Sequence, residues 1–475
     1  MQVNPDFPEA LCGLVNALLA VCDWREVYSE DPKWAGWMAR VSDLVTKQLG
    51  EGALYGAGAM QAEGRLQDWV ELAIKLTGDS RSEARQALTK RLSTFFSPLD
   101  RAANSINEGS FVIRFIERLM RASQRRWYHD RYGKAVNGND ATAAKLQQPF
   151  ARITAEETQA YARPMLPASL VTPAVPTVLP FHTFTYPLSA RQIRLISHRN
   201  ALRISQSTLS QYWLPPHVYP PPSPPSPRVN VGYVSSDLNN HPLAHLMQSV
   251  FGFHDRSRFN VFMYATTPSD QSPYRQKIEQ EAEHFLDVSS WSNQQVVERI
   301  LQDGIHVLMN LNGYTKGARN EIFAARPCPV QMEFMGFAGG LASSWTDWVV
   351  VDPIVCPPEM TCVDLWRQRR RQALAQGTPH PDDARPTNFG SDIDPEEPSD
   401  DWVYTERFIY MPHSYFVNDH AQGFREPPRR KGLDGQEVLP HKMTPDEAWA
   451  EEEQRRWMER KEVSTLLICF NAGDH

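Results

Sequence analysis

The 475-residue sequence lacks several features that would assign it to a class of protein at once. No uninterrupted apolar run reaches the roughly 18 residues that a membrane-spanning helix needs, so we predict no membrane contact. The N-terminus has no basic stretch followed by an apolar one, which predicts an intracellular protein without a secretory signal. The six cysteines have no paired short spacings, which argues against a disulfide framework and a structural zinc site.

The sequence also lacks an excess of basic residues. With 49 Lys and Arg against 56 Asp and Glu, the formal net charge is -7, which predicts no nucleic-acid partner. Glycine is scarcer than proline, at 25 residues against 37. A proline in a helix interior costs about 3 kcal/mol of helix stability. These prolines should therefore mark linkers and insertions between domains.

The N-terminal third of the chain predicts helices. Apolar residues recur at helical spacing from Leu11 to Cys22 and from Trp34 to Val45, which predicts two antiparallel amphipathic helices. The pair resembles one tetratricopeptide repeat, and a plain helical hairpin accounts for the pattern equally well. Further helices are predicted up to residue 165, and the basic stretch Arg121 to Arg126 within them is interpreted as a solvated helix face.

Prolines concentrate before residue 228 and the pattern then changes. Eight of the thirteen residues from Pro215 to Pro227 are proline, which favours a stiff polyproline spacer. Beyond it, short apolar runs alternate with helical stretches, as is typical of a parallel sheet covered by helices on both faces. The expected strands are Val229–Val234, Val261–Tyr264, Val307–Leu311, Val330–Met335 and Trp348–Val351.

Ligands bind such sheets at the carboxyl ends of the strands, and unusual residues follow three of the expected strands. His241 stands at a predicted helix N-terminus, where the helix dipole favours the neutral imidazole of a general base; a structural cap is the alternative. The loop after the third expected strand suits a polar or anionic ligand and contains Asn312, Gly313, Tyr314, Thr315 and Lys316. A third loop, around Gly339, would let a ligand approach the backbone closely. No metal site is expected, since the His241 and His245 pair has no nearby carboxylate.

Several strings of residues resemble the catalytic region of the O-linked N-acetylglucosamine transferases, which modify serine and threonine of intracellular proteins. The strings are Val231–Asp237, His241–Ser249, Gln302–His306, Asn312–Glu321 and Tyr410–His413, with Leu179–Leu188 leading into them. The resemblance implies an inverting, metal-independent glycosyltransferase with two Rossmann-like lobes (GT-B type). It implies UDP-N-acetylglucosamine as the donor substrate, no further cofactor, protein acceptors reached through helical repeats, and a place in the cytoplasm or nucleus.

The resemblance also implies roles for individual residues. In the family, the histidine matching His241 lines the sugar site and was proposed as a base, and Glu298 stands where an aspartate was also put forward as a base. The loop Asn312 to Lys316 lies beside donor and acceptor in the family. The string Ser464–Asn471 resembles the first strand of the second lobe, so that lobe is expected to be essentially missing from a truncated chain.

Taken together, these patterns predict an α/β fold with an N-terminal α-helical, tetratricopeptide-like region and the first lobe of a GT-B glycosyltransferase. The expected segments are a helical hairpin (1–50), a helical region (51–165), a Pro-rich linker (166–228), the first Rossmann-like lobe (229–424) with a disordered insertion (364–401), a charged helical connector (425–463) and the first strand of a truncated lobe (464–475). The activity of the chain is left open. A non-catalytic protein-interaction fragment is the alternative function.

Overall fold

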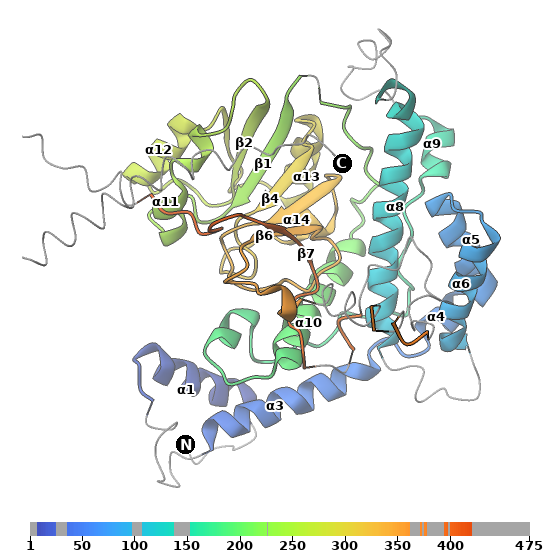
Figure 1. The fold of residues 1–475 in the computed structure, drawn as a ribbon, viewed down its shortest axis with the longest axis horizontal. Helices are drawn as coiled ribbons and strands as arrows, with labels where there is room; N and C mark the ends of the chain where they lie inside the picture. The colour runs from blue at the N-terminus through green and yellow to red at the C-terminus, as the bar shows by residue number, and fades with distance from the viewer. Residues whose placement is uncertain are drawn as a thin grey trace, which may run out of the picture.

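The computed structural model describes residues 7–24, 36–96, 107–136, 153–225, 227–361, 371–372, 375–377, 394–397 and 400–419. A parallel sheet of the order β3-β2-β1-β4-β5-β6-β7 forms its centre (Figure 1). The strands are β1 (Val229–Ser235), β2 (Phe259–Ala265), β3 (His284–Asp287), β4 (Val307–Asn310), β5 (Val330–Glu333), β6 (Trp348–Val351) and β7 (Arg407–Tyr410). The order reverses between β1 and β4, which is the arrangement of a doubly wound, Rossmann-like sheet.

Helices cover both faces of the sheet, as the alternating pattern predicts. On one face, α11 (Pro242–Met247) and α12 (Pro273–Glu281) pack against the apolar side chains of β1 and β2. On the other face, α13 (Asn293–Gln302) and α14 (Glu321–Ala324) pack against side chains of β1, β2 and β4. The predicted α/β architecture is therefore confirmed. The edge strands β3 and β7 went unpredicted because their side chains are only partly buried and form no continuous apolar run.

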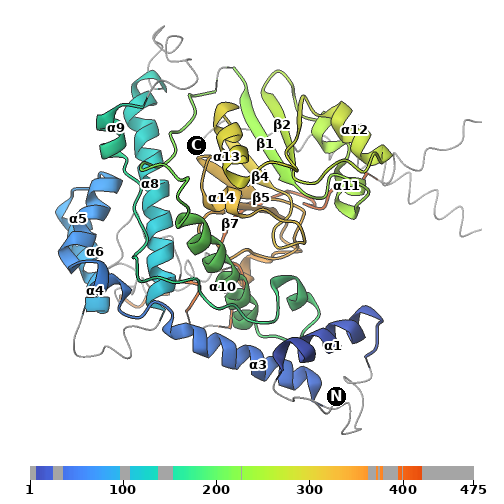
Figure 2. The same cartoon turned by 180° about the vertical axis from the view of Figure 1, so that it is seen from behind.

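A separate helical layer lies beside the sheet (Figures 1 and 2). Its helices are α1 (Pro8–Ala20), α3 (Trp37–Glu51), α4 (Ala59–Glu63), α5 (Leu66–Thr77), α6 (Ser82–Ser93), α8 (Glu108–Val136) and α9 (Ala155–Ala160). Short 3₁₀ turns are η1 (Gly52–Leu54), η2 (Thr94–Phe96), η4 (Pro180–Phe184), η5 (Val250–Gly252) and η6 (Pro358–Met360). The helices α1 and α3 contact each other, and their interpretation as a tetratricopeptide-like hairpin stays a prediction.

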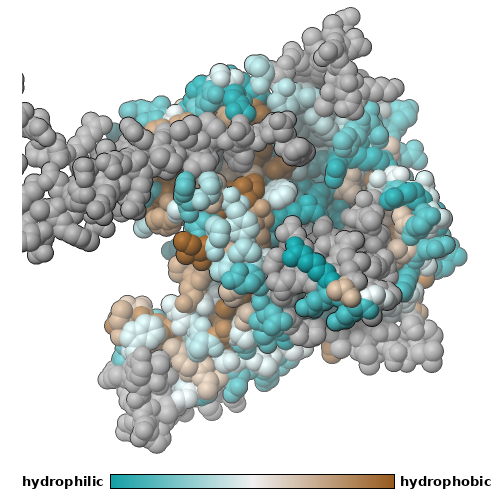
Figure 3. Space-filling model, viewed as in Figure 1, coloured by the Kyte–Doolittle hydropathy of each residue, from teal (hydrophilic) through white to brown (hydrophobic). Residues whose placement is uncertain are grey.

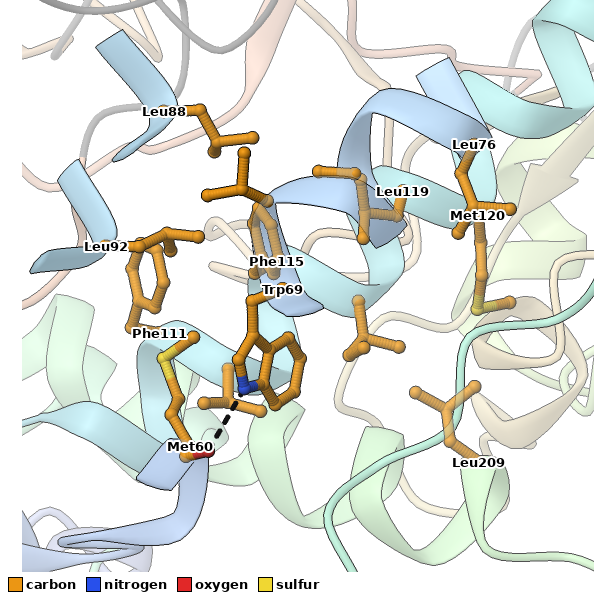
Figure 4. Close-up of a cluster of buried hydrophobic side chains, with 14 of the residues drawn as sticks. Met60, Trp69, Leu76, Leu88, Leu92, Phe111, Phe115, Leu119, Met120 and Leu209 are labelled. Carbon is orange, nitrogen blue, oxygen red and sulfur yellow. Dashed lines mark hydrogen bonds between the residues drawn. The ribbon is translucent and has the colours of Figure 1, made fainter. Parts of the chain in front are cut away.

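Within the helical layer, α4, α5, α6 and α8 share an apolar core, drawn in Figure 4, whereas α1 and α3 pack with α10 in a second cluster. The α5 residue Trp69 packs beside Phe115 of α8, with ring centroids 6.3 Å apart. Its indole Nε1 donates to the carbonyl oxygen of Met60 at 3.0 Å, so the polar edge of this buried ring is satisfied. Such a core allows these helices to be a packed domain rather than a loose extension of the sheet.

The segment 166–228 is not the extended linker that its prolines predicted. It contains α10 (Ala190–Leu209), which begins at a capping box formed by Ser189 and Gln192 and is mostly buried. Figure 2 shows α10 between α8 and the sheet, in contact with α14. Its inward-facing residues include Arg194 and His198, which are buried through hydrogen bonds rather than through apolar contacts, so apolar periodicity could not reveal them.

The basic stretch of α8 is not a solvated face either. Ser123 and Gln124 are buried, and Arg121 forms an ion pair with Asp347 at 3.1 Å. The Nη2 of Arg126 donates to the carbonyl oxygen of Ala160 at 2.6 Å. Since α8 lies between the sheet and the other helices, Arg121 and Arg126 join elements, whereas Arg125 is exposed as predicted.

Part of the predicted insertion 364–401 is packed against the helical layer. Asp394 accepts a hydrogen bond from Arg114 Nη2 at 2.7 Å, and Glu396 pairs with Arg199 Nη2 at 3.0 Å. Arg194 donates from Nε to the carbonyl oxygen of Pro395 at 2.8 Å and lies over the Trp402 ring, 3.7 Å from its centroid. We call residues 394–397 and 400–402 the strap. The rest of the predicted insertion is almost entirely outside the described residues, and the predicted connector and second-lobe strand lie wholly outside them.

Within the described ranges, no helix is both long enough and apolar enough to span a bilayer. On the surface of the face shown in Figure 3, hydrophobic residues form small groups among polar ones.

Candidate functional site

The loops after β1 and β4 are joined by one buried amide, that of Asn312. Its Oδ1 accepts from the backbone N–H of Ser236 at 2.9 Å. Its Nδ2 lies 2.8 Å from both Ser236 Oγ and Asp237 Oδ2. All three side chains are buried, so the network holds the two loops in one arrangement. The loops flank the point where the strand order reverses, which is where open α/β sheets bind ligands.

The side-chain amides of Asn310 and Asn320 also hold the loop after β4 in place. Asn310 Oδ1 accepts from the backbone N–H groups of Asn312 and Gly313, at 2.9 and 3.0 Å. Asn310 Nδ2 donates to Asn320 Oδ1 at 2.9 Å, and Asn320 in turn donates to the carbonyl oxygen of Gly313 at 2.8 Å. The sequence did not predict a role in the site for Asn310, Asn320, Ser236 and Asp237, although all but Asn310 lie within the resembling strings.

His241 is the N-cap of α11 and borders this network. Its Nδ1 accepts a hydrogen bond from the backbone N–H of Leu243 at 3.2 Å and lies 4.0 Å from Asp237 Oδ2. The side chain is 46% exposed. Because Nδ1 is the acceptor, the neutral ring carries its proton on Nε2 and presents a donor to a ligand. To serve as the predicted general base, the ring would have to release the helix cap.

Two of the predicted loop residues, Thr315 and Tyr314, are hydrogen-bonded within the protein, whereas a third, Lys316, is exposed. Thr315 and Tyr314 are structural: Thr315 Oγ1 donates to the carbonyl oxygen of Asn312 at 2.9 Å, and the Tyr314 hydroxyl lies 2.7 Å from the carbonyl oxygen of Leu341. Burial raises the pKa of Tyr314 well above its usual value, so this hydroxyl stays protonated. Lys316 is exposed, and its ammonium group forms no hydrogen bond or ion pair with the residues that the structure describes. Arg319 is held by Asn293 Oδ1 at 2.8 Å and by carbonyl oxygens, which occupies its guanidinium.

The glycine loop after β5, residues 336–340, closes the other side of the site. A methyl group on Gly336 would lie 1.7 Å from the carbonyl oxygen of Leu311, so only glycine fits there. Gly339 lies against aromatic rings, since a methyl group on it would be 2.9 Å from Phe337 and 3.5 Å from Phe184. The Phe337 ring packs against that of Phe184, with centroids 5.2 Å apart. A methyl group on Gly313 would lie 2.3 Å from Phe337 Cβ, so the glycine loop packs directly against the Asn312 loop.

Comparison with known proteins explains this combination of loops. Residues 165–365 match the family model described as Glycosyl transferase family 41. Through this segment, the chain is similar to glycosyl transferase family 41. The matched residues include α10, β1 to β6 and the three loops described above.

Named relatives of the family 41 segment come from plants and animals. The chain is 38% identical over 253 residues to a probable UDP-N-acetylglucosamine–peptide N-acetylglucosaminyltransferase of Arabidopsis thaliana, covering 52% of this chain and 22% of that protein. It is 35% identical over 255 residues to the UDP-N-acetylglucosamine–peptide N-acetylglucosaminyltransferase of Caenorhabditis elegans, covering 53% and 19%. The chain thus spans about a fifth of the length of these two relatives.

A solved structure of an O-GlcNAc transferase mutant from Thermobaculum terrenum aligns at a TM-score of 0.35 and 16% identity, covering 83% of this chain and 61% of that chain. A score this low adds nothing to the fold described above.

Glu298 lies away from the Asn312 network. Its helix α13 packs on the face of the sheet opposite to α11, and Glu298 is exposed there, accepting a hydrogen bond from Gln294 at 2.8 Å. The structure therefore does not bring Glu298 and His241 together, and the predicted catalytic role of Glu298 gains no support. The order of helices along the sequence does not determine which face of the sheet each helix covers. The sequence alone could therefore not show that Glu298 and His241 lie apart.

The described residues contain no group of three or more His, Cys, Asp and Glu side chains that could hold a metal ion. In the strap, Asp394 is paired with Arg114 at 2.7 Å.

Proposed function

We propose that the chain transfers N-acetylglucosamine from UDP-N-acetylglucosamine to serine and threonine hydroxyls of proteins, with inversion and without a metal ion. The observation that carries the proposal is the coincidence of the family 41 segment with the Asn312 network at the switch point of the sheet. Protein acceptors would be met by the helical layer, and the reaction would take place in the cytoplasm or nucleus. No further cofactor is needed for this chemistry.

In this reaction the acceptor oxygen bonds to the anomeric carbon, the bond from that carbon to UDP breaks, and the acceptor hydroxyl loses its proton. The exposed ammonium group of Lys316 supplies positive charge for the phosphates of the departing UDP. His241 donates a hydrogen bond from Nε2 to an oxygen of donor or acceptor, because Leu243 occupies Nδ1. In this ring orientation Nε2 already carries a proton, so the hydroxyl proton passes to water rather than to His241.

Two substitutions of His241 separate its ligand contact from its helix cap. Asparagine is a strong N-cap residue without a donor at the position of Nε2, whereas alanine supplies neither function. We expect both variants to lose transfer activity by about 10- to 100-fold, as for a lost hydrogen bond of 1–3 kcal/mol. Only His241→Ala should also lose stability, by about 1 kcal/mol in urea unfolding.

The matched control for this prediction is His245→Asn, one turn further along α11. His245 bonds Asn240 Oδ1 at 2.8 Å and packs against the Tyr274 ring, so it should not affect transfer. If His241→Asn kept full activity, the ligand contact assigned to Nε2 would be wrong.

The proposed function is tested by incubating the purified chain with UDP-N-acetylglucosamine carrying a radiolabelled sugar and a serine-containing peptide. Label on the peptide that disappears when serine is replaced by alanine supports the proposal. Absence of transfer and of UDP binding in calorimetry, with peptide binding retained, would instead support the non-catalytic interaction protein.

A further inference from the structure

A buried pair of carboxyl groups lies beneath the two loops of the site, and the reaction proposed above does not use it. Glu333 ends β5 and is 1% exposed, and Glu406, just before β7, is also buried. Neither oxygen of Glu333 has a hydrogen-bond partner among the residues that the structure describes. A buried carboxyl group without a hydrogen-bond partner lowers the stability of the folded protein. The presence of Glu333 at this position therefore needs a physical explanation.

Each carboxyl group supports a glycine of one loop. A methyl group on Gly313 would lie 2.8 Å from Glu333 Oε1, so this oxygen lies directly against the backbone of the loop after β4. A methyl group on Gly340 would lie 2.8 Å from Glu406 Oε2. Glu406 Oε1 also accepts from the backbone N–H of Ala342 at 2.7 Å. The two loops that form the site thus both rest on this carboxyl pair.

The second of these loops is bracketed by strained residues. Met335 and Ala342, at its two ends, have positive φ angles of 64° and 48°, which residues other than glycine rarely adopt. Ala342 is held from both sides, by Glu406 at its N–H and by His198 Nδ1, 2.9 Å from its carbonyl oxygen. A loop strained in this way keeps its conformation only while the groups beneath it stay in place.

We propose that Glu333 and Glu406 are positioning residues for the Gly313 loop and for the loop from Met335 to Ala342, and that both loops stay closed only while Glu333 is protonated. With a proton, the Glu333 carboxyl group is neutral and fits the apolar space under Gly313. Without it, an uncompensated charge beside Glu406 would have to reach water, and the route to water is the opening of the loops.

The electrostatic surroundings of Glu333 agree with the geometry. Burial, and then the neighbouring Glu406, raise the pKa of Glu333 well above its usual value of 4.5. Burial likewise raises the pKa of Glu406. The other titratable groups that sense the charge of Glu333 are the hydroxyls of Tyr314, Tyr404 and Tyr415, which are neutral.

The direction of the pH effect follows from these shifts. At pH values above 4.5, the usual pKa, and below the raised pKa of the closed form, Glu333 keeps its proton while the loops are closed and releases it when they open. Rising pH therefore favours opening, by up to about tenfold per pH unit for each such carboxyl group.

Amide hydrogen exchange followed by mass spectrometry tests this without any ligand. The reporters are the N–H of Gly313, bonded to Asn310, and the N–H of Ala342, bonded to Glu406. In the full chain, protection of peptides that contain these amides, corrected for intrinsic exchange, should fall up to about tenfold per unit between pH 5 and 8. Peptides from β1 and β2 should keep their protection.

Glu333→Gln is the matched variant, because the amide has the shape of the protonated carboxyl group and cannot ionise. It should retain protection at high pH and reduce the pH slope, and Glu333→Gln with Glu406→Gln should remove the slope. A wild-type chain whose loop protection does not change with pH would overturn the proposal, as would equal slopes in wild type and Glu333→Gln.

This inference concerns the site of the proposed function but does not depend on it. A chain that opens its loops with pH yet transfers no sugar would refute the proposed function alone.

Discussion

Gly336→Ala is expected to abolish ligand binding at the site and to lower the free energy of unfolding by about 3 kcal/mol. The new methyl group would lie 1.7 Å from the carbonyl oxygen of Leu311 and 2.7 Å from the backbone nitrogen of Asn312. Both are backbone atoms, which cannot rotate away as a side chain can. Relief requires the ends of β4 and β5 to separate, which would pull Asn312 away from Ser236. Urea unfolding and calorimetry with UDP-N-acetylglucosamine measure the two effects.

The control for this substitution is Gly339→Ala in the same loop. There the nearest atoms belong to the side-chain rings of Phe337 and Phe184, which can shift by a few tenths of an ångström. We expect a loss of about 1 kcal/mol or less. Equal unfolding midpoints for Gly336→Ala and wild type would contradict the packing described between β4 and β5.

Asn312→Ala is expected to cost about 3 kcal/mol of stability and to abolish sugar transfer. The substitution leaves the buried N–H of Ser236 without its acceptor and removes a donor from the Asp237 carboxylate, each at about 1–3 kcal/mol. With the amide gone, the loop after β1 keeps to the loop after β4 the longer hydrogen bond from Ser236 Oγ to the carbonyl oxygen of Lys316, at 3.3 Å. Chemical unfolding and the peptide-transfer assay give the two readouts.

Asn240→Ala serves as the comparison for that loss, since Asn240 is an exposed asparagine nearby whose Oδ1 meets only His245 among described side chains. It should change stability by less than about 1 kcal/mol. A cost for Asn312→Ala no greater than that for Asn240→Ala would mean that the Asn312 network does not hold the loops.

The central strands could be predicted because each is a continuous apolar run buried on both faces. β3 and β7 could not, since they lie at the sheet edges and expose their terminal residues. The helix α10 escaped prediction for another reason. Its burial depends on arginine and histidine finding partners far along the chain, and no local pattern records such partners.

The rule that ligands bind at the carboxyl ends of strands predicted which loops lie together at the site. It could do so because strand direction alone determines which loops share an edge of the sheet. The same rule could not sort the side chains within a loop. Tyr314 and Arg319 look like ligand contacts in sequence but are used to join α10 and α13 to the sheet, whereas Asp237 looked ordinary and lies at the centre of the network. Glu333 gave no signal, because a single glutamate at a strand end is indistinguishable from a solvated one.

The strap also sets the order in which this molecule can form. Arg194 bonds Pro395 across 201 positions, Arg199 bonds Glu396 across 197, and Arg114 bonds Asp394 across 280. During synthesis, α8 and α10 therefore leave the ribosome long before the residues that complete their packing. At about 5–20 residues per second, this interval lasts from roughly ten seconds to about a minute. Until the strap is synthesised, the packing of α8 and α10 stays incomplete. Contacts between residues so far apart in the sequence also make folding slow.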